Sequence, residues 1–186
     1  MTSLNRPLRL AMLALATATL ATSAGVAVLQ PALAQSGITI FGGVEAEYRL
    51  RYFIDFNTPR SRNARYYLQV NRTKLPREVV SFTIEYPESF TQRRGRLNVD
   101  AIELRQGEWR GGDTIPVQSI EWIEEEGVIE IIPESPIPAN TDFVVVMNDV
   151  LNPNRYGYHY FNLSMTYQGD VIDQYVGTWP LELAAD

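Results

Sequence analysis

Cysteine is absent from the 186-residue chain, and histidine occurs once, at position 159. Without cysteine the protein can form no disulfide, no thiolate metal site and no cysteine nucleophile. One histidine supplies only one imidazole, so a copper site would lack a second histidine ligand. The fold must therefore depend on its hydrophobic core.

Catalytic sequence motifs are absent as well. The chain contains no G-x-S-x-G, no H-E-x-x-H and no glycine-rich loop of the kind that cradles phosphates. A serine hydrolase would have to use His159, and no nucleophile elbow is recognisable in the sequence. We therefore expect a protein that is not an enzyme and that carries no cofactor.

The chain contains only one long apolar run, from Leu10 to Leu29. Arg6 and Arg9 precede this run and the small-residue site Ala32-Leu33-Ala34 follows it, which is the order of parts in a secretory signal. A run of about 20 apolar residues could also anchor the chain in a membrane, but alanine, threonine and glycine dilute it here. The sequence predicts export by the general secretory route to the periplasm or beyond, with cleavage before Gln35 and no membrane span afterwards.

Basic residues are scarce in the second half of the chain. The chain has 16 Lys and Arg against 22 Asp and Glu, a net charge of −6, and Arg155 is the only basic residue after Asp113. This balance opposes binding to nucleic acid, and the two halves are expected to pair and partly neutralise each other. The one basic cluster, Arg93, Arg94 and Arg96, is expected in an exposed loop that could contact an acidic polysaccharide or phosphate.

Short runs of alternating or β-branched residues recur between turns that contain proline and glycine. Strands are expected at residues 47–56, 64–70, 77–86, 119–133 (a hairpin), 141–150, 156–167 and 171–179. The pattern between Leu97 and Leu104 fits a strand or a short helix. Strands at this spacing predict an all-β fold, a single immunoglobulin-like antiparallel β-sandwich. The expected organisation is a signal peptide at 1–34, a flexible lead at 35–46, the sandwich at 47–180 and a tail at 181–186.

Four stretches of the chain carry a resemblance to a known family. They are "ARYYLQV", "LPREVVSFTIEYPE", "PIPANTDFVVVMNDVLNPNRYGYHYFNLSMTYQG" and "YVGTW". Together they resemble the cyanobacterial secreted family catalogued as a domain of unknown function (DUF 2808), and the resemblance covers roughly residues 64–179, most of the mature chain. The resemblance implies export, an all-β domain and a cell-envelope or extracellular setting. It implies no activity and no catalytic residues.

The stretch "NPNRYGYHYF" at residues 152–161 combines turn residues with aromatic residues and the single histidine. It is expected to be a turn that leads into a strand. His159 would then share the apolar face of the strand with Phe161 and Met165, which favours a packed histidine over a copper ligand formed with Met165 or Met147. No metal site is therefore expected.

Tyr156, Tyr158 and Tyr160 would lie on the opposite face of that strand, as a stripe about 13 Å long. Such a stripe can stack on sugar rings or anchor a protein partner, assisted by Trp109 or Trp179. It can equally be covered by a second sheet, and the sequence leaves both alternatives open. The four glutamates between residues 121 and 126 are expected in a solvated hairpin turn rather than in a calcium site.

The sequence thus predicts an exported, non-catalytic β-sandwich that acts as a structural or binding module of the cell envelope. One alternative is a carbohydrate-binding module that uses Tyr156, Tyr158, Tyr160 and Trp179, and another is a periplasmic metal-binding protein. The expected partner is an envelope polysaccharide or another envelope protein.

Overall fold

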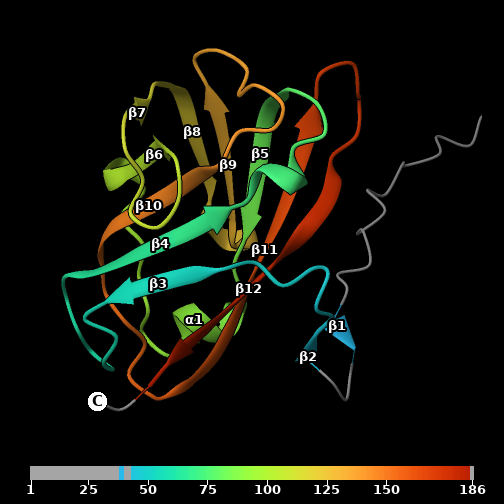
Figure 1. Cartoon of the computed structure of the whole chain (residues 1–186). Coiled ribbons are helices and arrows are strands. Elements are labelled where there is room, and N and C mark those ends of the chain that lie inside the picture. The colour runs from blue at the N-terminus through green and yellow to red at the C-terminus, as the bar shows by residue number, and fades with distance from the viewer. Residues whose placement is uncertain (1–37, 40–42, 185–186) are drawn as a thin grey trace, which may run out of the picture. The chain divides into compact units, whose positions relative to one another are not determined.

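The computed structural model describes residues 38–39 and 43–184, so the expected signal peptide lies outside the described residues. In the described part of the chain, ten strands form two five-stranded antiparallel sheets (Figure 1). In spatial order, the first sheet consists of β3 (Tyr52–Asp55), β4 (Ala64–Val70), β10 (Phe143–Val150), β6 (Ile102–Gln106) and β7 (Thr114–Ile115). The second consists of β12 (Gln174–Leu183), β11 (Gly157–Tyr167), β5 (Val79–Glu85), β9 (Val128–Pro133) and β8 (Val117–Ile123). This arrangement confirms the predicted all-β sandwich.

The remaining elements are short. The strands β1 (Ile38–Thr39) and β2 (Gly43–Val44) pair with each other as a separate ladder. One α-helical turn and three 3₁₀ turns complete the set: α1 (Glu88–Gln92), η1 (Arg72–Lys74), η2 (Val99–Ala101) and η3 (Glu124–Glu126). The stretch from Leu97 to Leu104, for which the sequence fits a strand or a short helix, contains a 3₁₀ turn and a strand, because η2 leads directly into β6.

The two sheets enclose one hydrophobic core because their strands alternate buried and outward-facing residues. Phe82 on β5 contacts Phe143 on β10 across the interface, with ring centroids 5.5 Å apart. On β11 the residues from His159 to Met165 alternate as predicted, since His159, Phe161, Leu163 and Met165 are all buried. The β-branched run 143–150 forms the middle strand of the first sheet, which is where a strand buried on both faces belongs.

The predicted strand at 47–56 is divided between the two sheets. Tyr48 and Leu50 bond to Thr178 of β12, through Thr178 N–H to Tyr48 O (2.7 Å) and Leu50 N–H to Thr178 O (2.9 Å). Only from Tyr52 does the chain join β4 in the other sheet. The alternating pattern is continuous across this crossing because both halves keep one side toward the core, so periodicity alone could not locate the break.

The C-terminal boundary also differs from the prediction. Strand β12 continues to Leu183, and both Leu181 and Leu183 are buried in the core. The expectation that the domain ends at residue 180 and is followed by a tail is therefore wrong for residues 181–183. The described part of the predicted lead likewise includes the strand β2, where Val44 is buried.

Gly177 allows the close approach of the crossing segment to β12. A Cβ at this position would lie 2.5 Å from Tyr48 O and 2.9 Å from Leu50 Cγ, both closer than van der Waals contact permits. We predict that Gly177→Ala lowers the free energy of unfolding by about 2 kcal/mol, because the edge of the sheet must shift to admit the methyl group. Urea denaturation measures the change, with Gly112→Ala as the control.

Gly112 is a suitable control because a Cβ there would meet its nearest neighbour, Gln106 O, at an ordinary 3.4 Å. The control variant should change the free energy of unfolding by less than about 0.5 kcal/mol. Equal effects of the two substitutions would contradict a steric role for Gly177.

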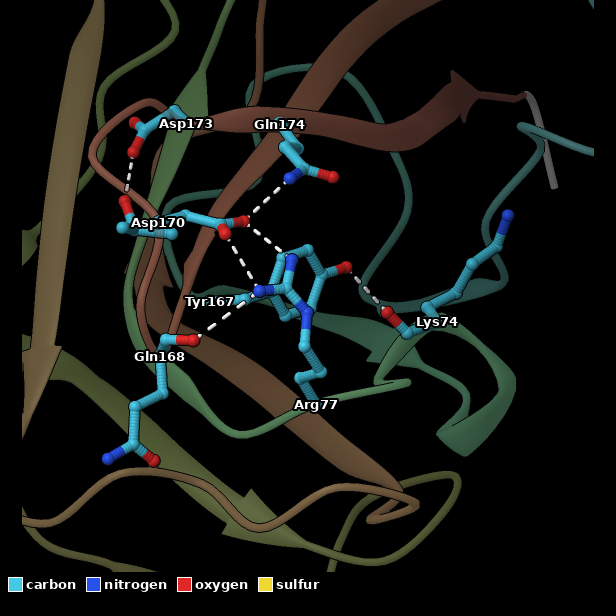
Figure 2. Close-up of polar contacts among 8 residues, drawn as sticks. Lys74, Arg77, Tyr167, Gln168, Asp170, Asp173 and Gln174 are labelled. Carbon is cyan, nitrogen blue, oxygen red and sulfur yellow. Dashed lines mark hydrogen bonds and ion pairs between the residues drawn. The ribbon is translucent and has the colours of Figure 1, made fainter.

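The turn between β11 and β12 is fastened to the β4–β5 connection by Arg77 (Figure 2). The guanidinium binds Asp170 through two contacts of 2.7 and 2.6 Å and lies over the ring of Tyr167. Gln174 adds a hydrogen bond to Asp170 (2.6 Å), and the hydroxyl of Tyr167 donates to Lys74 O (2.7 Å). Because these polar groups bind one another, the cluster has a structural role: it holds the β11–β12 turn to the β4–β5 connection.

Candidate functional site

The outward face of β11 begins with two stacked tyrosines. The rings of Tyr158 and Tyr160 lie 6.3 Å apart between centroids at an interplanar angle of 20°. Tyr158 is 52% exposed and Tyr160 is half-buried, so the first sheet does not cover this face of β11. The sequence left open whether this face is open to a ligand or covered by another sheet. The structure shows that it is not covered at Tyr158 and Tyr160.

Strand β12 holds the tyrosine pair in place from one side. Tyr158 lies opposite Glu182 in the β11–β12 register, and the Glu182 carboxylate, hydrogen-bonded to the phenol, raises the pKa of Tyr158. The Glu182 N–H donates to the hydroxyl of Tyr52 at 3.0 Å, and burial raises the pKa of Tyr52. Both phenols therefore stay protonated at neutral pH and can exchange hydrogen bonds with a ligand.

A tryptophan borders the same surface from the β6–β7 connection. Trp109 is 68% exposed and adopts a left-handed backbone conformation with φ 58°. Its neighbour Arg110 fastens the connection, since the guanidinium binds Asp55 (2.7 Å) and lies 5.3 Å from the centroid of the Phe53 ring. A bulky residue at positive φ is uncommon and costs free energy, which makes Trp109 a candidate for a functional role.

These aromatic residues line one hollow of about 730 Å³, which we call the aromatic groove. Its lining residues that bear on binding are Tyr52, Gln69, Trp109, Tyr158, Tyr160 and Glu182. Arg49 and Arg51, from the segment that crosses between the sheets, lie along the same groove. Aromatic faces beside amide, carboxylate and guanidinium groups can stack on the apolar faces of sugars while bonding their hydroxyls.

Two of the residues predicted for binding do not lie in the aromatic groove. Trp179 is completely buried in the core and donates its Nε1–H to Gln69 O at 3.0 Å, so it offers no surface to a ligand. Tyr156 precedes β11 and is 60% exposed, but it lines a separate hollow with Pro59 and Arg155. The predicted stripe of three tyrosines is therefore a pair, because the strand starts one residue after Tyr156.

The single histidine is a core residue. His159 is 1% exposed, its ring packs edge-on against Phe90 with centroids 5.5 Å apart, and Nδ1 lies 3.5 Å from Ser89 Oγ. Burial, together with the nearby positive charge of Arg93, lowers the pKa of His159 to about 4. Within residues 38–39 and 43–184, no three His, Asp or Glu side chains gather closely enough to hold a metal ion.

The sequence indicated part of the aromatic groove and missed the rest. Tyr158, Tyr160 and Trp109 were named from the sequence, whereas Tyr52 was expected on the inner face of its strand. Its position at the groove follows from the crossing of residues 48–52 between the sheets, which no local pattern shows. Glu182 was missed because the strand was expected to end before it.

The chain belongs to the family described as "Protein of unknown function (DUF2808)", whose model matches residues 38–183. No curated protein matches the chain. Across the described residues, no helix is both long enough and apolar enough to pass through a membrane.

Several solved structures show a weak similarity. The collagen-binding domain of a Staphylococcus aureus adhesin is 11% identical, with 72% of this chain and 95% of that chain covered and a TM-score of 0.41. The collagen-binding subdomain of the Enterococcus faecalis surface protein ACE is 11% identical, with 71% and 96% covered and a TM-score of 0.42. BslA, a bacterial hydrophobin, is 14% identical, with 73% and 97% covered and a TM-score of 0.46. Similarities of this size give no functional assignment.

Proposed function

We propose that the protein is an exported, non-catalytic binding module of the cell envelope that holds a polysaccharide in the aromatic groove. The observation that carries the proposal is that the exposed side chains of Trp109 and Tyr158 and the half-buried Tyr160 surround one hollow. Export is supported by the secretory-signal pattern of the N-terminal sequence. The absence of catalytic motifs from the sequence supports a binding role without chemistry.

A polysaccharide fits this groove on physical grounds. The stacked tyrosines and the tryptophan present flat apolar surfaces of limited mobility, on which the C–H faces of sugar rings can pack at low entropic cost. Gln69, Glu182 and the two arginines at the rim supply donors and acceptors for hydroxyl groups. An elongated chain of sugars could use both kinds of contact at once.

We predict that Tyr158→Ala and Trp109→Ala each weaken polysaccharide binding about five- to fifty-fold, because each removes a stacking surface of the size of an interface hot spot. Affinity gel electrophoresis against a panel of neutral and acidic polysaccharides gives the dissociation constants. Tyr156→Ala is the matched control, since Tyr156 is exposed to a similar degree but lies outside the groove.

The control should bind like the unmodified protein. Failure of the folded protein to bind any polysaccharide in the panel would refute the proposal, as would an equal loss in all three variants. The non-catalytic part of the proposal is tested separately by incubating the protein with the polysaccharides that it binds. We expect no release of reducing ends.

A further inference from the structure

A second hollow, of about 590 Å³, lies where three connecting segments meet. The β3–β4 connection contributes Arg60 and Arg62, and the β5–β6 connection contributes Arg94 and Arg96. The β10–β11 connection closes the hollow with Asn154. We call this hollow the arginine pocket. Only Arg94 and Arg96 belong to the basic cluster recognised in the sequence, because Arg60 and Arg62 are brought to it by the fold.

The walls of the arginine pocket are joined to one another by backbone hydrogen bonds. The β3–β4 connection is bonded to the β10–β11 connection from Arg60 N to Pro153 O (3.1 Å) and from Asn152 N to Ser61 O (2.8 Å). The β5–β6 connection is bonded to the same segment from Arg96 N to Leu151 O (3.0 Å), from Leu151 N to Arg96 O (2.9 Å) and from Asn154 N to Arg93 O (2.8 Å). Each of the two arginine-bearing connections is thus tied to the third. The four arginines are therefore presented from a pre-organised frame, which lowers the entropic cost of binding.

The four arginines of the pocket form no ion pair among the described residues. Among the described residues, the arginines with carboxylate partners are Arg72, Arg77, Arg105 and Arg110. Two of these pairs, Arg72–Asp142 and Arg77–Asp170, join the basic half of the chain to the acidic half, as the sequence predicted. No ion pair among the described residues involves an arginine of the pocket, and Asp149 is the one acidic residue that lines it.

Backbone strain is concentrated at the same place. Arg60, Arg94 and Asp149 have φ values of 64°, 65° and 54°, a region that residues with a Cβ seldom adopt. Asp149 occupies a register shift in the pairing of β10 with β4, and such bulges occur often beside functional sites. Strain of this kind is retained where a surrounding structure and a function hold it in place.

We propose that the arginine pocket binds a tetrahedral oxyanion, a phosphate or sulfate group, either free or as an ester on a polymer. Guanidinium groups suit such a ligand, because each can donate two parallel N–H bonds to its oxygens, and two separate connections supply them here. A pocket of four unpaired arginines on a chain of net charge −6 concentrates positive potential at one point. Extended nucleic acid does not fit this pattern, since it needs a basic surface that follows the backbone.

The proposal is tested by isothermal titration calorimetry at low ionic strength with sodium sulfate, sodium phosphate, dextran sulfate and uncharged dextran. We expect saturable binding of a sulfate- or phosphate-bearing probe, weakened at least about ten-fold by the double substitution Arg62→Gln/Arg96→Gln. Arg65→Gln is the matched control, because Arg65 is exposed on β4 and lines none of the hollows described above. Circular dichroism and thermal melting establish that each variant is folded.

Arg94→Gly provides a second and sharper variant. Glycine adopts φ 65° without strain, so the substitution should leave the melting temperature unchanged or raise it while binding falls about ten-fold. A variant that keeps or gains stability and loses binding separates the role of the guanidinium in the pocket from any structural role.

The probes distinguish the two sources of the oxyanion. Binding of the inorganic ions assigns the pocket to a free ion, whereas binding of dextran sulfate alone assigns it to an ester on a polymer. Tyr158→Ala should leave either signal unchanged, which keeps this result independent of the aromatic groove. The proposal is overturned if no sulfate or phosphate probe binds the folded protein, or if Arg65→Gln weakens binding as much as the double substitution.

Discussion

Replacing Asn152 with alanine is expected to lower the free energy of unfolding by about 4 kcal/mol. The side chain is 1% exposed and binds three groups: Oδ1 accepts from the Tyr66 hydroxyl (2.7 Å), and Nδ2 donates to Phe56 O (3.0 Å) and Thr58 O (2.9 Å). Alanine leaves the buried Tyr66 hydroxyl without a partner, and Phe56 O and Thr58 O each keep only a backbone donor, Thr58 N (2.8 Å) and Ser61 N (3.2 Å). Denaturant unfolding followed by circular dichroism measures the loss.

Two further substitutions identify the hydrogen bonds as the cause. Tyr66→Phe removes one donor and leaves Asn152 with its two bonds to carbonyl groups, so it should cost only about 1 kcal/mol. Asn152→Asp keeps the shape but loses the Nδ2 donor and buries a carboxyl group, so it should resemble the alanine variant. A loss below about 1 kcal/mol for Asn152→Ala would contradict this account.

The second large effect is a loss of stability in mild acid that depends on His159. Its pKa in the folded protein is lowered to about 4, chiefly by burial, whereas an unfolded histidine titrates near about 6.5. The unfolded chain therefore takes up a proton below that pH while the folded protein does not. The contribution of His159 to the free energy of unfolding is fully present above about pH 6.5. It is lost between about pH 6.5 and 4, and the loss between pH 7.5 and 5 is about 2 kcal/mol.

His159→Leu should abolish most of this pH dependence, because leucine matches the apolar surroundings formed by Phe90 and Phe161 and carries no titratable group. The free energy of unfolding, measured in urea at pH 7.5, 6 and 5, should then be nearly constant for the variant. An unchanged slope in the variant would show that other groups, rather than His159, cause the acid sensitivity.

Much of the fold could be predicted because its strands are local patterns. The runs at residues 64–70 and 128–133 appear as strands at the expected positions, and Gly127 takes the left-handed conformation (φ 68°) that a glycine in the turn permits. The crossing of residues 48–52 between the sheets could not be predicted. It depends on the approach of Tyr48 to Gly177, which is a contact between residues far apart in the sequence.

The candidate sites show the same division. Period-two alternation placed Tyr158 and Tyr160 on one face of β11 and His159 on the other. It could not show whether that face was open. Trp179, which was named from the sequence as an aromatic residue that could assist the tyrosines, has its ring in the core. The arginine pocket needed the three-dimensional fold, because Arg60 and Arg96 come from connections that meet only in space.

Residues with positive φ occur in the lining of both hollows. Of the six non-glycine residues with positive φ among the described residues, Arg60, Arg94 and Asp149 line the arginine pocket and Trp109 lines the aromatic groove. Glycine adopts positive φ without steric strain, so the charged and aromatic residues at these four positions are candidates for roles in the two proposed sites.

The most direct measurement of the central claim is quenching of tryptophan fluorescence by acrylamide, with and without a polysaccharide that the protein binds. Trp109 is 68% exposed, whereas Trp179 is buried and Trp122 is half-buried, so the quencher acts mainly on Trp109. The account predicts that the polysaccharide protects this fluorescence and that Trp109→Phe abolishes the protection. Binding that leaves Trp109 fully open to the quencher would place the ligand elsewhere and contradict the account.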